Sequence, residues 1–250
     1  MVTQEGRLPS LERSVADFAR QTERDRELVV VHDGGAAFHA SVEAIAKATP
    51  GGTVRVVRVS ISPRSSLGAL RNIALDCARG DYVCQWDDDD RHHPRRLEVQ
   101  MTTLRAEASD ASVLADQLHL FADAREMYWD DWDAQPAPLN FVPGTLLARR
   151  GAVARYPDQA RGEDTALALA MLTAGRRFAR IGERGYLYVY VFDGRNSFDR
   201  AHHAAISLYH RFRGSRLLRL EPELRRHVAD YAPPLGPFTM PHEDGELRFG

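Results

Sequence analysis

The sequence has no excess of basic charge, few cysteines and no long apolar run. Its 33 lysine and arginine residues face 35 aspartate and glutamate residues, for a formal net charge of −2, so it lacks the basic surface of a nucleic-acid-binding protein. Its apolar runs stay below the roughly 18 residues that a membrane span needs, and we see no secretory leader. The two cysteines, Cys77 and Cys84, lie in different predicted elements, so we expect reduced thiols in a cytoplasmic protein.

The first 110 residues alternate between predicted strands and helices. Apolar strands are expected at residues 28–31, 54–59 and 82–86. Helical periodicity occupies the segments between and before them, with Ser10 expected to cap the first helix. This alternation predicts an α/β fold with a mostly parallel central sheet flanked by helices.

After residue 110, predicted extended segments replace the regular alternation of strands and helices. We expect them at residues 113–121, 126–129, 178–181 and 187–192, with one helix beginning near Gly162. The length of 250 residues suits one large domain, or one domain with an appendage.

The segment from His210 to Val228 places six arginines among leucines. An ordinary solvated helix that is interrupted near Pro222 accounts for this pattern. Peripheral contact with a membrane, at its inner surface, and formation of a homodimer are the alternatives.

Four aspartates, Asp87 to Asp90, directly follow the strand expected at residues 82–86. In open α/β sheets, ligands bind beyond the carboxyl ends of the strands. Adjacent carboxylates repel one another, and a divalent cation such as Mg²⁺ or Mn²⁺ would offset their charge. A solvated turn before a helix is the competing interpretation, because Pro94 suits a first helical turn.

The surrounding residues distinguish these interpretations. An Arg71-Asn72 helix leads to Gly80, then to a strand, to the aspartates and to Pro94. This pattern closely resembles family 2 glycosyltransferases. Two flanking stretches extend the resemblance: Val30 to Gly35 resembles the V-D-D-G loop of that family, with His32 in place of the first aspartate, and Gly162-Glu163-Asp164 resembles its G-E-D motif.

The resemblance implies the GT-A fold over residues 1–205, with a nucleotide-binding half at 1–110 and an acceptor half at 111–205. Residues 206–250 would then form a C-terminal helical extension. It also implies roles for nine side chains, of which seven bind the nucleotide or the metal and two act in catalysis. The nucleotide-binding residues would be Thr3, Asp33, Arg71 and Asp88, and the residues that hold Mn²⁺ or Mg²⁺ would be Asp87, Asp89 and His202.

The resemblance further implies an inverting, metal-dependent transferase that moves a sugar from a nucleotide-diphosphate donor, with a UDP-sugar favoured, to a hydroxyl acceptor. Asp164 matches the general base that such chemistry requires, and Glu163 would support it. Both acids also suit the amino end of a helix for structural reasons. The alternatives are a non-catalytic binder of sugar nucleotides and a nucleotidyltransferase, for which Gly6-Arg7 is too little of a glycine-rich basic loop.

Two further expectations concern less typical features. Residues 2–5 match only the end of the apolar strand with which the family opens, so we expect either that the natural chain begins upstream or that neighbouring strands are shortened. Tyr128, Trp129 and Trp132 lie among aspartates, where they could bind the acceptor or pack into the core.

Overall fold

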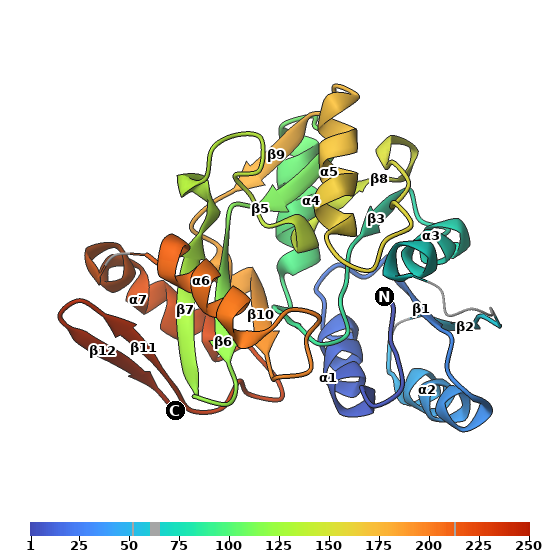
Figure 1. The fold of residues 1–250 in the computed structure, drawn as a ribbon, viewed down its shortest axis with the longest axis horizontal. Helices are drawn as coiled ribbons and strands as arrows, with labels where there is room; N and C mark the ends of the chain where they lie inside the picture. Colours follow the sequence, from blue (N-terminus) through green and yellow to red (C-terminus); the bar gives the residue numbers. More distant parts are fainter. Residues whose placement is uncertain (52, 61–65, 213) are drawn as a thin grey trace.

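The computed structural model describes residues 1–51, 53–60, 66–212 and 214–250 (Figure 1). Its amino-terminal half contains α1 (Leu8–Ala19), β1 (Glu27–His32), α2 (Ala36–Ala48), β2 (Thr53–Arg58), α3 (Leu67–Cys77), β3 (Tyr82–Cys84), β4 (Arg91–His92) and α4 (Arg96–Ala106). These bounds confirm the predicted alternation of strands and helices. Strands β1 and β2 pair in parallel, from Glu27 opposite Thr53 to His32 opposite Arg58.

The remaining chain contains β5 (Ala111–Leu114), β6 (Asp116–Phe121), β7 (Glu126–Asp131), β8 (Leu147–Arg149), α5 (Glu163–Thr173), β9 (Phe178–Ile181), β10 (Tyr188–Phe192), α6 (Arg200–His210), α7 (Gly214–Val228), β11 (Phe238–His242) and β12 (Gly245–Phe249). One sheet has the strand order β3-β8-β5-β9, and another has the order β12-β11-β7-β6-β10-β4. In Figure 1, β1, β2 and α2 lie at one end of the molecule, and the β11–β12 hairpin lies at the other.

Two local predictions about helix ends are wrong. Helix α1 begins at Leu8 with Pro9 in its first turn, so Ser10 lies inside the helix, where its hydroxyl donates to Arg7 O at 3.0 Å. Helix α7 continues through Pro222 without interruption. Its buried face of Leu217, Leu220 and Leu224 packs into the core formed by β6, β7 and β10, and this packing offsets the hydrogen bond that proline cannot donate.

The C-terminal segment also contributes strands. The helix expected between His210 and Val228 is present as α7, whereas the sequence pattern predicted neither α6 before it nor the β11–β12 hairpin after it. The hairpin joins the edge of the six-stranded sheet, where Thr239 N donates to Arg125 O at 2.9 Å. Phe238, Met240 and Leu247 belong to the same hydrophobic core as the leucines of α7.

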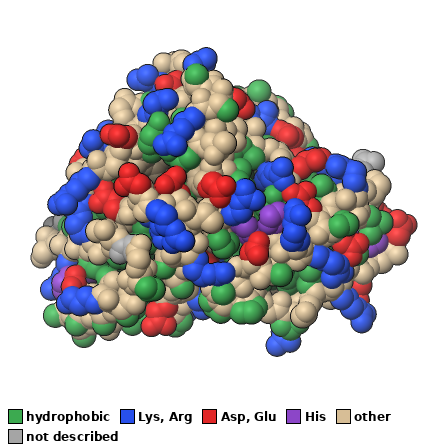
Figure 2. Space-filling view, turned by 180° about the vertical axis from the view of Figure 1, so that it is seen from behind, with side chains coloured by type: hydrophobic (Ala, Val, Ile, Leu, Met, Phe, Trp, Pro, Cys, Tyr) green, Lys and Arg blue, Asp and Glu red, His purple; other side chains and the backbone are tan. Residues whose placement is uncertain are grey.

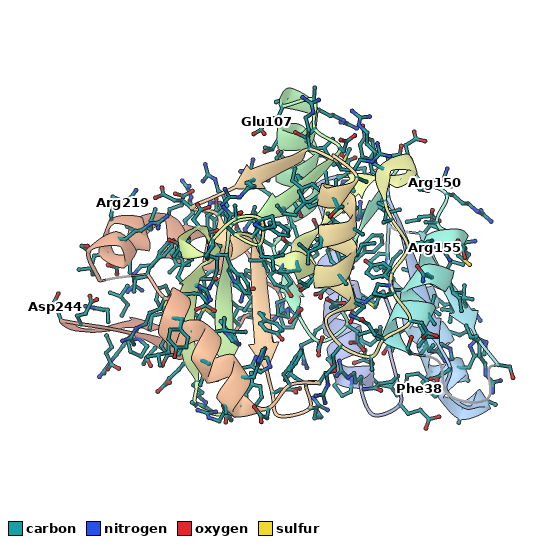
Figure 3. All side chains as sticks on the ribbon, turned by 45° about the horizontal axis from the view of Figure 1, so that its top comes forward. Phe38, Glu107, Arg150, Arg155, Arg219 and Asp244 are labelled. Carbon is teal, nitrogen blue, oxygen red and sulfur yellow. The ribbon has the colours of Figure 1, made fainter. Side chains whose placement is uncertain are left out.

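The arginines of α7 are mostly engaged in ion pairs. Arg216 contacts Asp131 and Glu183, and Arg219 also contacts Glu183; Arg219 extends outward from α7 in Figure 3. Arg213, named in the same pattern, lies outside the described residues. Figure 2 shows acidic and basic side chains interspersed over the face of the molecule opposite to that seen in Figure 1. Of the helices that the structure describes, none is both long and apolar enough to cross a membrane.

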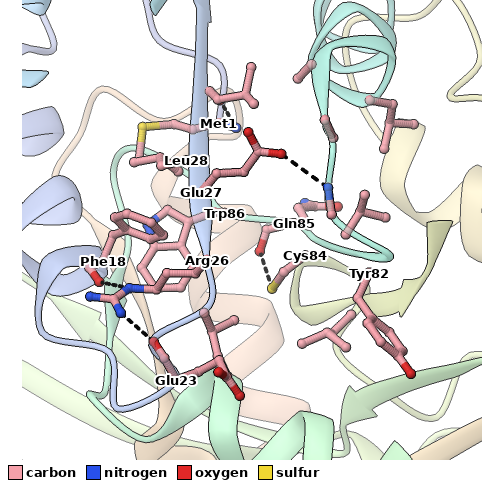
Figure 4. Close-up of a pocket in the computed structure, with 18 of the residues that line it drawn as sticks. Met1, Phe18, Glu23, Arg26, Glu27, Leu28, Tyr82, Cys84, Gln85 and Trp86 are labelled. Atoms are coloured by element: carbon pink, nitrogen blue, oxygen red, sulfur yellow. Dashed lines mark hydrogen bonds between the residues drawn. The ribbon is translucent and has the colours of Figure 1, made fainter. Parts of the chain in front are cut away.

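The first three residues form an extended segment that runs parallel to β1, with an isolated bridge between Val2 and Val31. The amino group of Met1 donates to Val29 O at 2.9 Å, Val31 N donates to Met1 O at 3.0 Å, and Thr3 N donates to Val31 O at 3.0 Å. Beyond Met1, a cavity of about 310 Å³ separates β1 from β3. Leu28, Tyr82 and Trp86 are among its lining residues (Figure 4).

The cavity therefore lies along the path that the extended segment 1–3 would follow if it were lengthened before Met1. β3 is also shorter than the predicted strand, since it ends at Cys84 rather than at Trp86. Within the described residues, β1 and β3 belong to separate sheets, so the backbone groups that face the cavity are not joined across it. Such a slot has both the apolar lining and the strand edges that an extended segment needs.

We expect that a designed segment of five alternating β-branched residues, fused before Met1, will raise the midpoint of thermal unfolding by several degrees. The reason is that it would cover apolar lining and pair with the edge of β1. The measurement is calorimetry of the fusion beside a Gly/Ser fusion of equal length. Equal midpoints for the two fusions would contradict the expectation.

Candidate active site

A cleft of about 570 Å³ lies at the ends of the strands, between the amino-terminal half and helices α5 and α6. Its volume falls in the range of small-molecule sites. All nine residues selected from the sequence line this cleft: Thr3, Asp33, Arg71, Asp87, Asp88, Asp89, Glu163, Asp164 and His202. The fold thus brings together side chains from six separate segments of the chain.

Two arginines form ion pairs with the acidic cluster, Arg71 with Asp87 and Arg7 with Asp88 and Asp89. Arg71 Nη2 donates to Asp87 Oδ1 at 2.9 Å, and Gln85 Nε2 donates to the other oxygen of Asp87 at 3.1 Å. Arg7 Nη1 donates to Asp88 Oδ1 at 3.0 Å and to Asp89 Oδ2 at 2.6 Å. Burial, together with the charge of Asp89, still raises the pKa of Asp88 to about 7, and burial also raises the pKa of Asp89.

Arg7 is the site residue that our reading of the sequence missed. The sequence pattern presents Gly6-Arg7 only as too short a glycine-rich basic loop, although Arg7 follows Thr3 closely and directly precedes α1. Besides the two aspartates, its Nη2 donates to Arg195 O at 3.1 Å, and Arg195 Nη1 donates back to Gly6 O at 3.3 Å. Arg7 therefore ties the acidic cluster to the loop before α6.

Asp90 differs from its three neighbours because its carboxylate is held by the protein. It accepts a hydrogen bond from the hydroxyl of Tyr188 and another from Val191 N, the latter at 3.0 Å. Only 2% of the residue is exposed, and burial raises its pKa well above the usual range. These contacts fasten the aspartate turn to β10, so we assign Asp90 a structural role.

The predicted acids Glu163 and Asp164 begin helix α5. Gly162 precedes them with φ at 70°, a backbone conformation that favours glycine. Glu163 is buried, and its Oε1 lies 3.1 Å from Arg71 Nε; burial raises its pKa. Asp164 accepts a hydrogen bond from Thr165 N at 2.6 Å and lines the cleft. Arg71 thus links the acidic cluster, through Glu163, to the segment that carries Asp164.

His202 lies at the rim of the cleft. Its ring stacks on Phe198 with centroids 4.2 Å apart, and Arg161 lies 5.3 Å from the centre of the same Phe198 ring. Among the described residues, the ligand atoms of His202, Asp87 and Asp89 do not all lie within 4.8 Å of one another. His203 points elsewhere: it is fully buried, with its Nδ1 3.0 Å from His119 Nε2.

The three aromatic residues considered for acceptor binding have different locations. Trp132 lines the cleft and stacks on His210, with ring centroids 5.0 Å apart. Trp129 is a core residue that stacks on Phe212. Tyr128 donates from its hydroxyl to Glu126. Only the position of Trp132 is compatible with contact to a molecule in the cleft.

The carboxylates of Asp87 and Asp89 have the chemistry of a site for a hard divalent cation. Mg²⁺ and Mn²⁺ bind carboxylate oxygens, and the consecutive Asp87, Asp88 and Asp89 all line the cleft, with Asp88 and Asp89 both bonded to Arg7 Nη1. The raised pKa values of Asp88 and Asp89 indicate that Arg7 does not fully offset the cost of burying these two carboxylates. The residues present therefore fit such an ion.

Comparison with curated proteins gives two glycosyltransferases as relatives. Cholesterol galactosyltransferase of Borreliella burgdorferi is 27% identical over 112 residues, which are 45% of this chain and 30% of that protein. The putative colanic acid biosynthesis glycosyl transferase WcaA of Escherichia coli K12 is 25% identical over 138 residues, 55% of this chain and 46% of that protein. The chain spans less than half the length of either relative.

Solved structures match over most of the chain. S. aureus TarS 1–349 in complex with UDP superposes with a TM-score of 0.60 at 14% identity, covering 92% of this chain and 78% of TarS 1–349. The mannosyltransferase PcManGT of Pyrobaculum calidifontis, in complex with GDP-Man and Mn²⁺, has a TM-score of 0.60 at 16% identity, covering 93% and 71%. These similarities confirm the predicted GT-A fold.

The model of glycosyl transferase family 2 matches residues 2–137, more than half of the chain. This span contains Thr3, the loop with Asp33, helix α3 with Arg71, and the aspartates. The prediction of a glycosyltransferase is therefore confirmed at the level of family and fold. The chain belongs to glycosyl transferase family 2.

Proposed function

We propose that this glycosyltransferase is an inverting, metal-dependent enzyme that transfers a sugar from a UDP-sugar to an acceptor hydroxyl. One observation carries the proposal: Asp33, the aspartates at 87–89 and Asp164 line the same cleft although they come from distant segments. A donor lying along this cleft would have its base near Asp33, its diphosphate near the aspartates and its sugar toward Asp164.

The nucleotide end of the cleft has the polar groups for a base and a ribose. Thr3 is held by its backbone bond to β1, and Asp33 follows β1 directly. Asp88 lines the same cleft, and its carboxylate pairs with Arg7. We assign base recognition to Asp33, a supporting contact to Thr3, and a contact to the ribose or metal to Asp88. The solved relative TarS binds UDP, which supports a uracil nucleotide as the donor.

Asp87 and Asp89 would hold Mn²⁺ or Mg²⁺, and His202 could become a further ligand if its ring left Phe198. When bound, such an ion supplies positive charge that offsets the charge developing on a leaving diphosphate. Arg71 supplies positive charge from the protein itself, since its guanidinium lies against both Asp87 and Glu163. The Mn²⁺ that accompanies GDP-Man in PcManGT supports this assignment.

Asp164 is the proposed general base. Its carboxylate takes the proton of the acceptor hydroxyl as that oxygen bonds to the anomeric carbon of the sugar. The bond from this carbon to the diphosphate oxygen breaks, and the electron pair leaves with the diphosphate. Attack from the opposite face inverts the configuration. Glu163 positions Arg71 and keeps α5 oriented, as its buried ion pair requires.

Nucleotide binding is expected to depend on metal. UDP with Mn²⁺ should raise the midpoint of thermal unfolding, because ligands that bind only the folded state stabilise it by mass action. UDP alone should raise it less, and GDP, dTDP and CDP should be weaker at equal concentration. A scanning-fluorimetry matrix of the four nucleotides, with and without Mn²⁺, measures this. Stabilisation that is independent of Mn²⁺ would contradict the metal requirement.

Asp164→Asn should lower the rate of UDP-sugar hydrolysis or transfer by about 10²–10⁴-fold, the usual contribution of a general base. Its UDP–Mn²⁺ thermal shift should stay unchanged, because the carboxylate does not hold the nucleotide in our assignment. The control is Asp123→Asn, an exposed acid in the turn between β6 and β7. An unchanged rate in Asp164→Asn would remove this residue as the base.

Arg7→Gln should bind Mn²⁺ more tightly than the unmodified protein when no nucleotide is present, by about 10-fold or more. The reason is that Arg7 makes charge-assisted bonds to Asp88 and Asp89 that a cation must displace. Titration of free Mn²⁺ by electron paramagnetic resonance measures this affinity. Arg24→Gln, at an exposed arginine, is the control. Equal or weaker Mn²⁺ binding by Arg7→Gln would refute the competition.

A further inference from the structure

A second group of metal-ligating side chains lies outside the cleft. His93 follows β4, and His227 and Asp230 lie at the end of α7. Among the described residues, these three are the only set of at least three histidine, cysteine or acidic side chains whose ligand atoms all lie within 4.8 Å of one another. None of the three lines the cleft.

The spacing of their ligand atoms matches one face of a tetrahedron. His93 Nε2 lies 3.2 Å from Asp230 Oδ2 and 3.3 Å from His227 Nδ1, and His227 Nδ1 lies 3.5 Å from Asp230 Oδ2. Tetrahedral Zn²⁺ has bonds of about 2.0–2.2 Å to such ligands, which puts neighbouring ligand atoms roughly 3.3–3.5 Å apart. A single ion could therefore contact all three atoms without large movements of the backbone.

The surroundings hold the two imidazoles in place and leave one side open. His93 is fully buried and His227 is 6% exposed, whereas half of the Asp230 side chain is exposed. The ring of His227 stacks on Tyr186, with centroids 3.9 Å apart. Neutral imidazole is the form that binds metal. The exposed side chain of Asp230 offers an entry path for an ion.

One contact defines the competing, metal-free arrangement. Arg95 N donates to His93 Nδ1 at 3.1 Å, so Nε2 carries the ring proton and donates it toward Asp230. Coordination through Nε2 moves this proton to Nδ1, and the Arg95 contact then opens. Once Nδ1 carries the proton, it can no longer accept from the Arg95 N–H. Metal binding should therefore change the environment of the Arg95 amide.

We propose that His93, His227 and Asp230 form a Zn²⁺ site that fastens the end of α7 to the segment between β4 and α4. Two imidazoles and one carboxylate, with a water as fourth ligand, are a donor set that Zn²⁺ accepts readily. This set differs from the all-oxygen cluster of Asp87 to Asp89, which suits Mg²⁺ or Mn²⁺. The proposed role of the ion is to link these two segments, and it does not depend on the proposed reaction.

The test uses the full chain and Zn²⁺ alone, after dialysis against a chelator. Zn²⁺ at 100 times its dissociation constant should raise the unfolding midpoint by about 5–10 °C. The shift should vanish in His227→Phe, which keeps a ring against Tyr186, and in Asp230→Ala, at a half-exposed position. His242→Ala and Asp89→Asn are controls that should keep it, because neither residue belongs to the site.

A second measurement does not depend on the stability of the variants. Co²⁺ bound in place of Zn²⁺ should give the intense visible absorption of a tetrahedral complex, and a ¹⁵N spectrum should show a shifted Arg95 amide. A Zn²⁺ shift that persists in both His227→Phe and Asp230→Ala would overturn the proposal, since the ion would then bind elsewhere. Absence of any shift, or a weak octahedral Co²⁺ spectrum, would also overturn it.

Discussion

The free-energy cost of burying several carboxylates after β3 determines how the charged side chains of the cleft are arranged. Three carboxylates lie next to one another, and burial raises the pKa of Asp88 and Asp89 despite the adjacent guanidinium of Arg7. The protein offsets this cost with arginines brought from two sides, Arg7 before α1 and Arg71 on α3. Each arginine has a further contact, so the same charge compensation also connects the surrounding elements.

These further contacts explain why distant segments act as one site. Arg71 joins Asp87 to Glu163 and hence to α5, while Arg7 joins Asp89 to the loop at Arg195 and hence to α6. Because α5 carries Asp164 and α6 carries His202, these contacts connect the acidic cluster with the two helices that carry those residues.

The C-terminal segment is integrated with the domain by packing rather than attached as a separate appendage. Leucines of α7 and residues of the β11–β12 hairpin share a core with β6, β7 and β10. The cluster of His93, His227 and Asp230 lies where α7 meets the segment after β4. An ion held there would add a further link at this junction.

The sequence by itself determined the family, the alternation of strands and helices in the amino-terminal half and nine of the side chains that line the cleft. It could do so because short motifs with fixed spacing, such as the aspartates after a strand and Gly162-Glu163-Asp164, report local geometry directly. It did not predict Arg7, the β11–β12 hairpin or the unbroken helix at Pro222. Ion pairs across 81 residues, such as Arg7 with Asp88, and a strand added at a sheet edge leave no local pattern. Only tertiary packing decided them, because the energy that stabilises such contacts comes from partners far away along the chain.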